Sequence, residues 1–237
     1  MTGTPELLLF CLHHAGAGAS AYRNWQKLIG RRIEVVPVQL PGREGRFREP
    51  AEPSIRRLAE RLQEPLLQRA GGTPFALFGH SMGAVLSYEL SHRLTRAGRP
   101  PVHLAVSAYA PPHIRVPTRV HTLSDQEFLD YVVGLEGTVP AILESPELLE
   151  LLLPLLRVDF AACDSYEYAE RGRLDVPLTA FGGDSDPGVS VPVLERWAEL
   201  TSGPAGLEVF PGGHFYLLDQ LEAVLDALTG KLGIPRE

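Results

Sequence analysis

The sequence is poor in cysteine and has no long apolar run, and each shortage excludes a class of protein. Its only two cysteines, Cys11 and Cys163, lack the paired spacing of a zinc site, so we expect no metal and a reducing compartment. No apolar stretch reaches the roughly 20 residues that cross a bilayer, and the N-terminus lacks the basic region of a signal peptide. These absences predict a soluble cytoplasmic protein with no membrane partner.

Excess positive charge is also lacking. The chain has 22 Lys and Arg residues against 29 Asp and Glu residues, a formal net charge of −7, which argues against binding nucleic acid. Six arginines nevertheless gather in one stretch: Arg43, Arg46, Arg48, Arg56, Arg57 and Arg61. We favour a solvated loop and helix face for this cluster, and a docking patch for an acidic partner is the alternative.

The order of apolar runs predicts an α/β fold. A chain of 237 residues suits one domain over residues 1–237, and we find no internal repeat or low-complexity linker. Short apolar runs without alternation, typical of strands buried on both faces, alternate with helical patterns such as the one that Ser54 caps. The runs are 7–12, 33–38, 74–78, 102–108, 176–181 and 207–210, and a C-terminal helix is expected from about Leu217 to Leu232. We therefore predict a mostly parallel central sheet flanked by helices, with ligands bound beyond the carboxyl ends of the strands.

This alternation lapses over about 112–170. A helix is expected to begin at Ser124, and 146–156 is apolar nearly all round. That stretch is either a helix buried on most sides or part of a helical insertion that covers an apolar cavity. We favour the second interpretation, a lid insertion within the domain.

The stretch "FGHSMGA" at 78–84 has the Gly-x-Ser-x-Gly pattern of a nucleophile elbow. It lies between an apolar run and a helical pattern, where a tight turn would present the Ser81 hydroxyl above the sheet. The pattern alone is weak because short matches occur by chance, but its strand-turn-helix context is strong. We expect Ser81 to be a nucleophile rather than a structural turn residue.

A serine nucleophile needs a base and a carboxylate that orients it. In this architecture the partners follow in the order Ser, acid, His, each after a later strand. Of eight histidines only His214 lies after the acid loop, and it is the expected base. Asp184 and Asp186 are both available as the acid. We favour Asp186 and interpret Asp184 as a turn-stabilising residue.

The developing oxyanion needs two backbone donors. The Met82 amide, directly after the serine, is one candidate, and the Ala15 amide in the glycine-rich "HHAGAG" loop is the other. For His14 a loop-shaping hydrogen bond is favoured over direct catalysis. The adjacent His13 and His14, with no carboxylate at ligand spacing, are poor evidence for a metal.

Six segments that span nearly the whole chain carry a family resemblance. They are "HAGAGAS" at 14–20, "LPGREGR" at 40–46, "GHSMGA" at 79–84, "LRVDFAACDSYEY" at 156–168, "GGDSDPGV" at 182–189 and "FPGGHFYL" at 210–217. In these segments the chain resembles the type II thioesterases of polyketide and nonribosomal peptide synthesis, within the α/β-hydrolase superfamily. The "PGRE" segment and the stretch with Asp159, Tyr166 and Tyr168 are the most discriminating. The resemblance departs at His13, where the family often has proline.

The resemblance implies hydrolysis of acyl groups from the phosphopantetheine arm of carrier proteins, through an acyl-Ser81 intermediate and without a cofactor. It implies editing of misprimed or stalled synthases, in which acyl-loaded carrier proteins, commonly acidic, are the partners. Alternatives are a general carboxylesterase, a medium-chain fatty acyl thioesterase and a non-catalytic binding protein on a hydrolase scaffold. Because one chain supplies the whole triad, a monomer is expected.

Overall fold

A six-stranded sheet forms the centre of the molecule. The computed structural model describes residues 4–135 and 146–236, and within them every strand pair is parallel, in the order β2-β1-β3-β4-β5-β6. The strands are Leu7–Leu12 (β1), Ile33–Pro37 (β2), Phe75–His80 (β3), His103–Ser107 (β4), Leu178–Gly183 (β5) and Ala205–Phe210 (β6). The predicted mostly parallel sheet is confirmed, and its strands all end at one edge.

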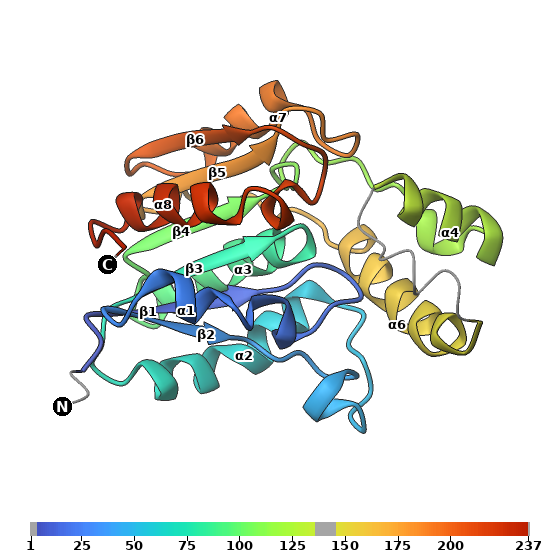
Figure 1. Ribbon diagram of the computed structural model, residues 1–237, viewed down its shortest axis with the longest axis horizontal. Helices are drawn as coiled ribbons and strands as arrows, with labels where there is room; N and C mark the ends of the chain where they lie inside the picture. Colours follow the sequence, from blue (N-terminus) through green and yellow to red (C-terminus); the bar gives the residue numbers. More distant parts are fainter. Residues whose placement is uncertain (1–3, 136–145, 237) are drawn as a thin grey trace.

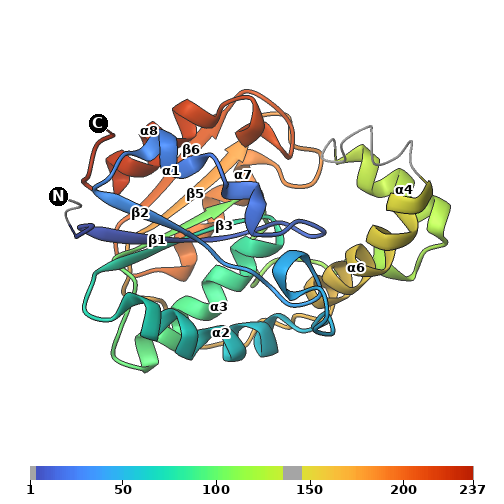
Figure 2. The same ribbon diagram turned by 60° about the horizontal axis from the view of Figure 1, so that its bottom comes forward.

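Helices cover both faces of this sheet. The even-numbered side chains of β1 pack in one apolar core with α2 (Ile55–Ala70) and α3 (Met82–Arg96). The odd-numbered ones pack in a second core with α1 (Trp25–Ile29) and α8 (Leu221–Lys231). The views of Figures 1 and 2 agree that these two pairs of helices lie on opposite sides of the strands. Burial on both faces explains why the strands read as continuous apolar runs.

The chain between β4 and β5 departs from this layered pattern. It carries α4 (Asp125–Gly134) and α6 (Pro146–Asp164), which lie beyond the carboxyl ends of the strands, to the right in Figure 1. The Ser124 hydroxyl accepts a hydrogen bond from the Glu127 amide, and the Glu127 side chain in turn binds the Ser124 amide. This capping box explains why the helix begins where the sequence predicts.

Several element boundaries differ from the sequence-based prediction. The helix expected to end near Leu156 continues to Asp164, with Pro154 inside it. Strand β5 begins at Leu178, one residue after Pro177, because proline has no amide hydrogen to donate to a sheet. The C-terminal helix, expected from about Leu217, begins at Leu221 after a 3-10 turn.

Candidate functional site

Ser81 occupies a strained turn between β3 and α3. Its φ of 54° and ψ of −119° lie in a region that residues other than glycine rarely adopt, at a cost of about 1–3 kcal/mol. Two backbone hydrogen bonds hold the turn, one from the Ser81 amide to the Ser107 carbonyl and one from the Ala84 amide to the Ser81 carbonyl, each 2.8 Å long. The turn lifts the hydroxyl above the edge of the sheet.

Two glycines make this turn possible by letting backbone segments approach closely. A Cβ on Gly79 would lie 2.0 Å from the Gly83 carbonyl oxygen. A Cβ on Gly83 would lie 2.1 Å from the Leu12 carbonyl oxygen, on the neighbouring strand. Neither contact is tolerable, and both obstacles are backbone atoms. The elbow therefore requires glycine at both positions, as its sequence pattern suggests.

His214 connects Ser81 to Asp186 by hydrogen bonds. His214 Nδ1 lies 2.9 Å from Asp186 Oδ2, and His214 Nε2 lies 3.0 Å from Ser81 Oγ. An ionised carboxylate can only accept, so the Asp186 contact places the ring proton on Nδ1 and leaves Nε2 to accept the serine proton. The Asp186 side chain is fully buried and is also held by the Gly188 amide at 2.7 Å. The three side chains have the geometry of a Ser-His-Asp triad.

Asp184 has a different environment from Asp186. Its side chain is exposed and accepts hydrogen bonds from the Gly212 amide at 3.1 Å and from the Ser185 hydroxyl. The Asp184 amide also donates to the Phe210 carbonyl, so Asp184 joins the loop after β5 to the loop after β6. This contact fixes the two loops relative to each other. Of the two carboxylates, that of Asp186 is the one hydrogen-bonded to His214.

Met82 and Ala15 lie beside Ser81. Both line the same cavity as the Ser81 and His214 side chains. Met82 is the first residue of α3, where amides have no acceptor within the helix and the helix dipole favours negative charge. Ala15 belongs to the loop that follows β1. Leu12, the last residue of β1, packs against Gly83 of the elbow. Residues from two different elements therefore border the cavity next to Ser81.

Neutral aromatic rings surround His214. The His80 and Phe215 rings lie 5.4 Å and 5.1 Å from the His214 ring, and the His14 ring contacts both of them edge-on. Burial, followed by repulsion from neighbouring histidines, lowers the pKa of His14 to about 3 and that of His80 well below its usual value. Both rings are therefore uncharged at neutral pH.

Three histidines have roles that the sequence did not assign. The His80 Nδ1 atom lies 2.8 Å from Ser107 Oγ, which in turn contacts the Tyr216 hydroxyl, so this ring is tied to β4 and not to Ser81. His14 packs through ring contacts. The loop-shaping hydrogen bond instead comes from the neighbouring His13, whose buried Nδ1 lies 2.9 Å from the His14 carbonyl.

Arg43 is buried and not part of an exposed patch. Its guanidinium makes two hydrogen bonds to the Asp159 carboxylate, 2.7 Å and 2.8 Å long, with the two side chains 5% and 1% exposed. The hypothesis of a docking patch that includes Arg43 is therefore wrong, because a docking residue must reach solvent. The hypothesis stays open only for the exposed arginines Arg48, Arg56, Arg57 and Arg61. The motif "PGRE" contains Arg43 and the motif "RVDF" contains Asp159, but the spacing of the two motifs does not indicate that the ion pair forms.

A cavity of about 520 Å³ extends from Ser81 to the helices between β4 and β5. Tyr131 of α4 and Phe160 of α6 form part of its wall, together with Val189 and Val193 from the loop after β5 and from α7 (Val191–Glu195). The combination of triad residues and apolar side chains in one wall suits an acyl chain. Of the predicted 112–170 segment, 136–145 lies outside the described residues.

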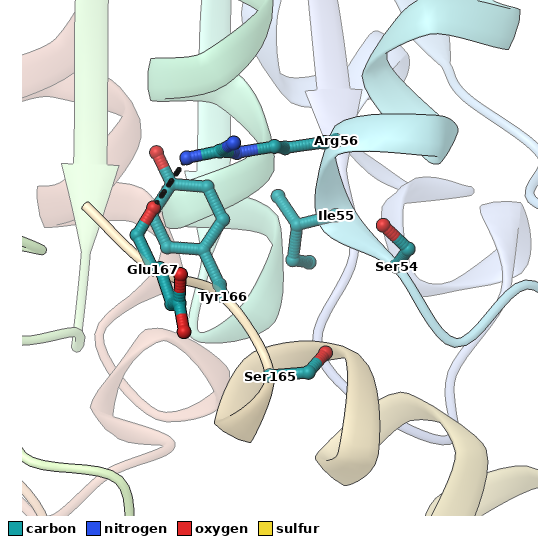
Figure 3. Close-up of a pocket in the computed structure, with 6 residues that line it drawn as sticks. All are labelled: Ser54, Ile55, Arg56, Ser165, Tyr166 and Glu167. Carbon is teal, nitrogen blue, oxygen red and sulfur yellow. Dashed lines mark hydrogen bonds between the residues drawn. The ribbon is translucent and has the colours of Figure 1, made fainter. Parts of the chain in front are cut away.

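A second hollow, of about 90 Å³, lies between the start of α2 and the chain after α6 (Figure 3). The Arg56 guanidinium donates to the Glu167 carbonyl at 2.7 Å and lies over the Tyr166 ring. The Ser165 hydroxyl bonds to the Pro53 carbonyl. The Arg56 guanidinium and the Ser165 hydroxyl therefore already have partners within the protein, and none of the triad residues lines this hollow.

Two further observations concern membrane-spanning helices and metal sites. In residues 4–135 and 146–236, none of the helices combines the length and the apolar character required to span a membrane. In the same part of the chain, no three His, Cys, Asp or Glu side chains group closely enough to hold a metal ion.

Comparisons with known proteins agree with this architecture. A family model described as "Thioesterase domain" matches residues 8–232. The chain is 40% identical to linear gramicidin dehydrogenase LgrE of Brevibacillus parabrevis, over 98% of this chain and 90% of that protein. The name of that relative assigns it a different activity, so sequence identity to it does not by itself identify a reaction.

Two solved structures are similar over nearly their whole length. The RedJ thioesterase from the prodiginine pathway of Streptomyces coelicolor has 36% identity and a TM-score of 0.91, covering 98% of this chain and 94% of that one. The type II thioesterase BorB from the borrelidin biosynthetic cluster has 38% identity and a TM-score of 0.89, with the same coverage. The predicted α/β-hydrolase fold is confirmed.

Proposed function

Since the chain belongs to the thioesterase domain family and is a thioester hydrolase, we propose that it removes acyl groups from the phosphopantetheine arm of carrier proteins. Its role is that of an editing type II thioesterase in polyketide or nonribosomal peptide synthesis, and its similarity to BorB, a type II thioesterase of the borrelidin biosynthetic cluster, supports this role. The observation that carries the proposal is the chain of hydrogen bonds from Ser81 through His214 to Asp186, in the wall of a cavity that apolar side chains also line.

The first half-reaction transfers the acyl group to Ser81. The Ser81 hydroxyl attacks the thioester carbonyl carbon while its proton moves to His214 Nε2, 3.0 Å away. The negative charge that develops on the carbonyl oxygen is held by the Met82 and Ala15 amides. When the tetrahedral intermediate collapses, the carbon–sulfur bond breaks, and the departing pantetheine sulfur takes the proton from His214. The products are a carrier thiol and an acyl-Ser81 ester.

The second half-reaction returns the enzyme to its starting state. His214 takes a proton from a water molecule, whose oxygen attacks the acyl-Ser81 ester through the same oxyanion site. Collapse releases a carboxylic acid and restores the Ser81 hydroxyl with the proton from His214. Asp186, fully buried and bound to His214 Nδ1, stabilises the imidazolium in both halves. This scheme uses the residues of one chain, in accord with a monomer.

The 112–170 segment is proposed to act as a lid over the acyl chain. Tyr131 of α4, Leu135 directly after that helix and Phe160 of α6 line the cavity that contains Ser81, which supports this role. Both cysteines are buried free thiols, and their reduced state supports a cytoplasmic location.

The decisive test compares carrier-bound thioesters with oxygen esters. Carrier proteins loaded with acetyl, butyryl and hexanoyl groups are incubated with the enzyme, and intact mass reports the free carrier thiol. A matched oxygen ester of the pantetheine arm is assayed in parallel, with Ser81→Ala as the inactive control. We expect kcat/KM to favour the thioester at least tenfold. Equal or faster cleavage of the oxygen ester would indicate a general esterase, and no cleavage of either would indicate a non-catalytic protein.

A further inference from the structure

Helix α6 reaches into the loop that carries Ala15. Asp159, in the middle of that helix, accepts a hydrogen bond from the Gly16 amide at 2.8 Å through Oδ2. The same carboxylate binds Arg43, which also donates to the Ala17 carbonyl at 3.2 Å. One buried ion pair therefore holds the loop on both sides of Gly16, the residue next to Ala15.

Gly16 fits against the same helix through a second contact. Its φ of +76° is in the left-handed region, and a Cβ there would lie 2.4 Å from Leu156 Cδ2. Leu156 precedes Asp159 by three residues, so both side chains lie on one face of α6. The loop is thus fixed by a polar contact and by close packing, both from a helix that also lines the cavity.

We propose that Asp159 and Arg43 are positioning residues for the oxyanion site. By holding Gly16, they set the direction of the neighbouring Ala15 amide, so that the donor is in place only when α6 lies against the loop. This inference rests on the proposed function, in which the Ala15 amide binds the oxyanion. It assigns to the cavity-lining helix a part in the chemistry as well as in covering the acyl chain.

Arg43 also keeps the pair electrically neutral. The Asp159 carboxylate binds the amide of Gly16, the residue next to Ala15, and an unpaired carboxylate there would oppose the negative charge that develops on the substrate carbonyl. Loss of Arg43 should therefore slow the reaction more than loss of the Asp159 charge, which leaves a cation nearby. A purely structural pair predicts no such asymmetry, because removing either charge leaves a buried partner unmatched.

The test measures transition-state binding apart from substrate binding. Arg43→Gln, Asp159→Asn and the double variant are compared with Glu89→Gln, which breaks another buried ion pair, with Arg171, at a site that touches neither the loop nor the cavity. The readouts are kcat and KM on butyryl-pantetheine, the inhibition constant of a trifluoromethyl ketone that forms an oxyanion on Ser81, and Tm.

We expect Arg43→Gln to lower kcat by about 10² or more, the order of loss found when one oxyanion donor is removed. The affinity for the ketone should fall in proportion, with KM changed less than about threefold. Asp159→Asn should lower kcat and ketone affinity less than Arg43→Gln does. The double variant should have a kcat at least tenfold higher than that of Arg43→Gln. Glu89→Gln should lower Tm yet keep kcat within about threefold. Folded Arg43→Gln with wild-type kcat and ketone affinity would overturn the proposal, as would a change in KM alone.

If Arg43→Gln does not fold, two neutral double variants replace it. Arg43→Gln with Asp159→Asn keeps an acceptor for the Gly16 amide, and Arg43→Gln with Asp159→Leu removes it. The proposal requires the Leu variant to lose at least tenfold more in kcat and in ketone affinity, and equal values would contradict it. Wild-type enzyme that does not cleave the thioester would overturn the proposed function and this inference with it. Normal wild-type activity with no difference between the variants would overturn this inference alone.

Discussion

The edge of the sheet and the pair of helices between β4 and β5 are held in place by different means. At the edge, Ser81 and the loop of Asp186 are fixed by backbone hydrogen bonds and by glycines that allow no added side chain. Helices α4 and α6 share a small apolar core around Phe128, and α6 is joined to the rest by the ion pairs of Asp159 and Asp164 and by Ala162 and Cys163, which reach the main core. The edge therefore has little freedom, whereas the helices can be altered without rebuilding the sheet.

The largest effect should follow from removing a side chain at the edge. Ser81→Ala and His214→Ala should each lower kcat by about 10⁴ or more, because members of a triad act as a unit. The measurement is kcat on butyryl-pantetheine, with circular dichroism to show that each variant folds. Residual activity above about 1% of wild type in either variant would mean that another group performs its role.

The two carboxylates after β5 provide a matched pair for the next test. Asp186→Asn should lower kcat by about 10³–10⁴, because the amide favours the wrong tautomer of His214. Asp184→Asn should lower it less than about tenfold, since the exposed Asp184 side chain only bridges to Gly212 and Ser185. The kcat values of the two variants show which carboxylate orients His214. The assignment of the acid is wrong if Asp184→Asn is the more damaging change.

Helix α7 lines the cavity but supplies no triad residue, so a change there should alter substrate preference and not the rate of chemistry. Val193→Phe places a larger side chain in the wall of the cavity. We expect kcat/KM for a decanoyl thioester to fall at least tenfold, because the longer chain needs the lost volume, while acetyl turnover stays within about threefold. Glu195→Gln, an exposed change on the same short helix, is the control. Equal losses for both chain lengths would contradict acyl binding along this wall.

The smallest effect concerns stability against pH. Burial lowers the pKa of His13 to about 3, so below its unfolded pKa near 6.5 the unfolded chain binds a proton that the native state does not. The free energy of unfolding should therefore fall as pH decreases from 6.5 towards 3. His13→Asn should reduce this slope by about 1.4 kcal/mol per pH unit.

Urea unfolding at several pH values between 6.5 and 4 measures the slope. Val224→Ala, a buried apolar change remote from the histidines, should lower stability but leave the slope as in wild type. An unchanged slope in His13→Asn would show that this ring is not the group that couples folding to protons.

The fold was predictable because its signals are local. Buried strands give continuous apolar runs, the Ser54 and Ser124 caps mark helix starts, and the elbow pattern has steric reasons that one strand and one turn contain. The choice of Asp186 as the acid candidate follows from its place after β5, and the structure brings it within hydrogen-bond distance of His214.

The ion pair of Arg43 and Asp159 could not be predicted in the same way. Its two residues are 116 positions apart, and their contact depends on how α6 lies over the loop after β1, which no local pattern encodes. The net charge of −7 for the chain and the run of arginines that includes Arg43 instead favour an exposed position for Arg43. The boundary of the C-terminal helix was missed for a related reason, since the apolar Leu217 fits either a helix or the tight turn that follows His214.

Transfer of the acyl group to Ser81 tests the central claim most directly. A carrier protein loaded with a hexanoyl group is mixed with enzyme, the reaction is quenched with acid within milliseconds to seconds, and peptide mass spectrometry locates any adduct. The proposed mechanism predicts a transient hexanoyl group on the peptide that contains Ser81, formed as the free carrier thiol appears and lost as hexanoic acid accumulates. A carrier that stays loaded, or a hexanoyl adduct on a residue other than Ser81, would contradict it.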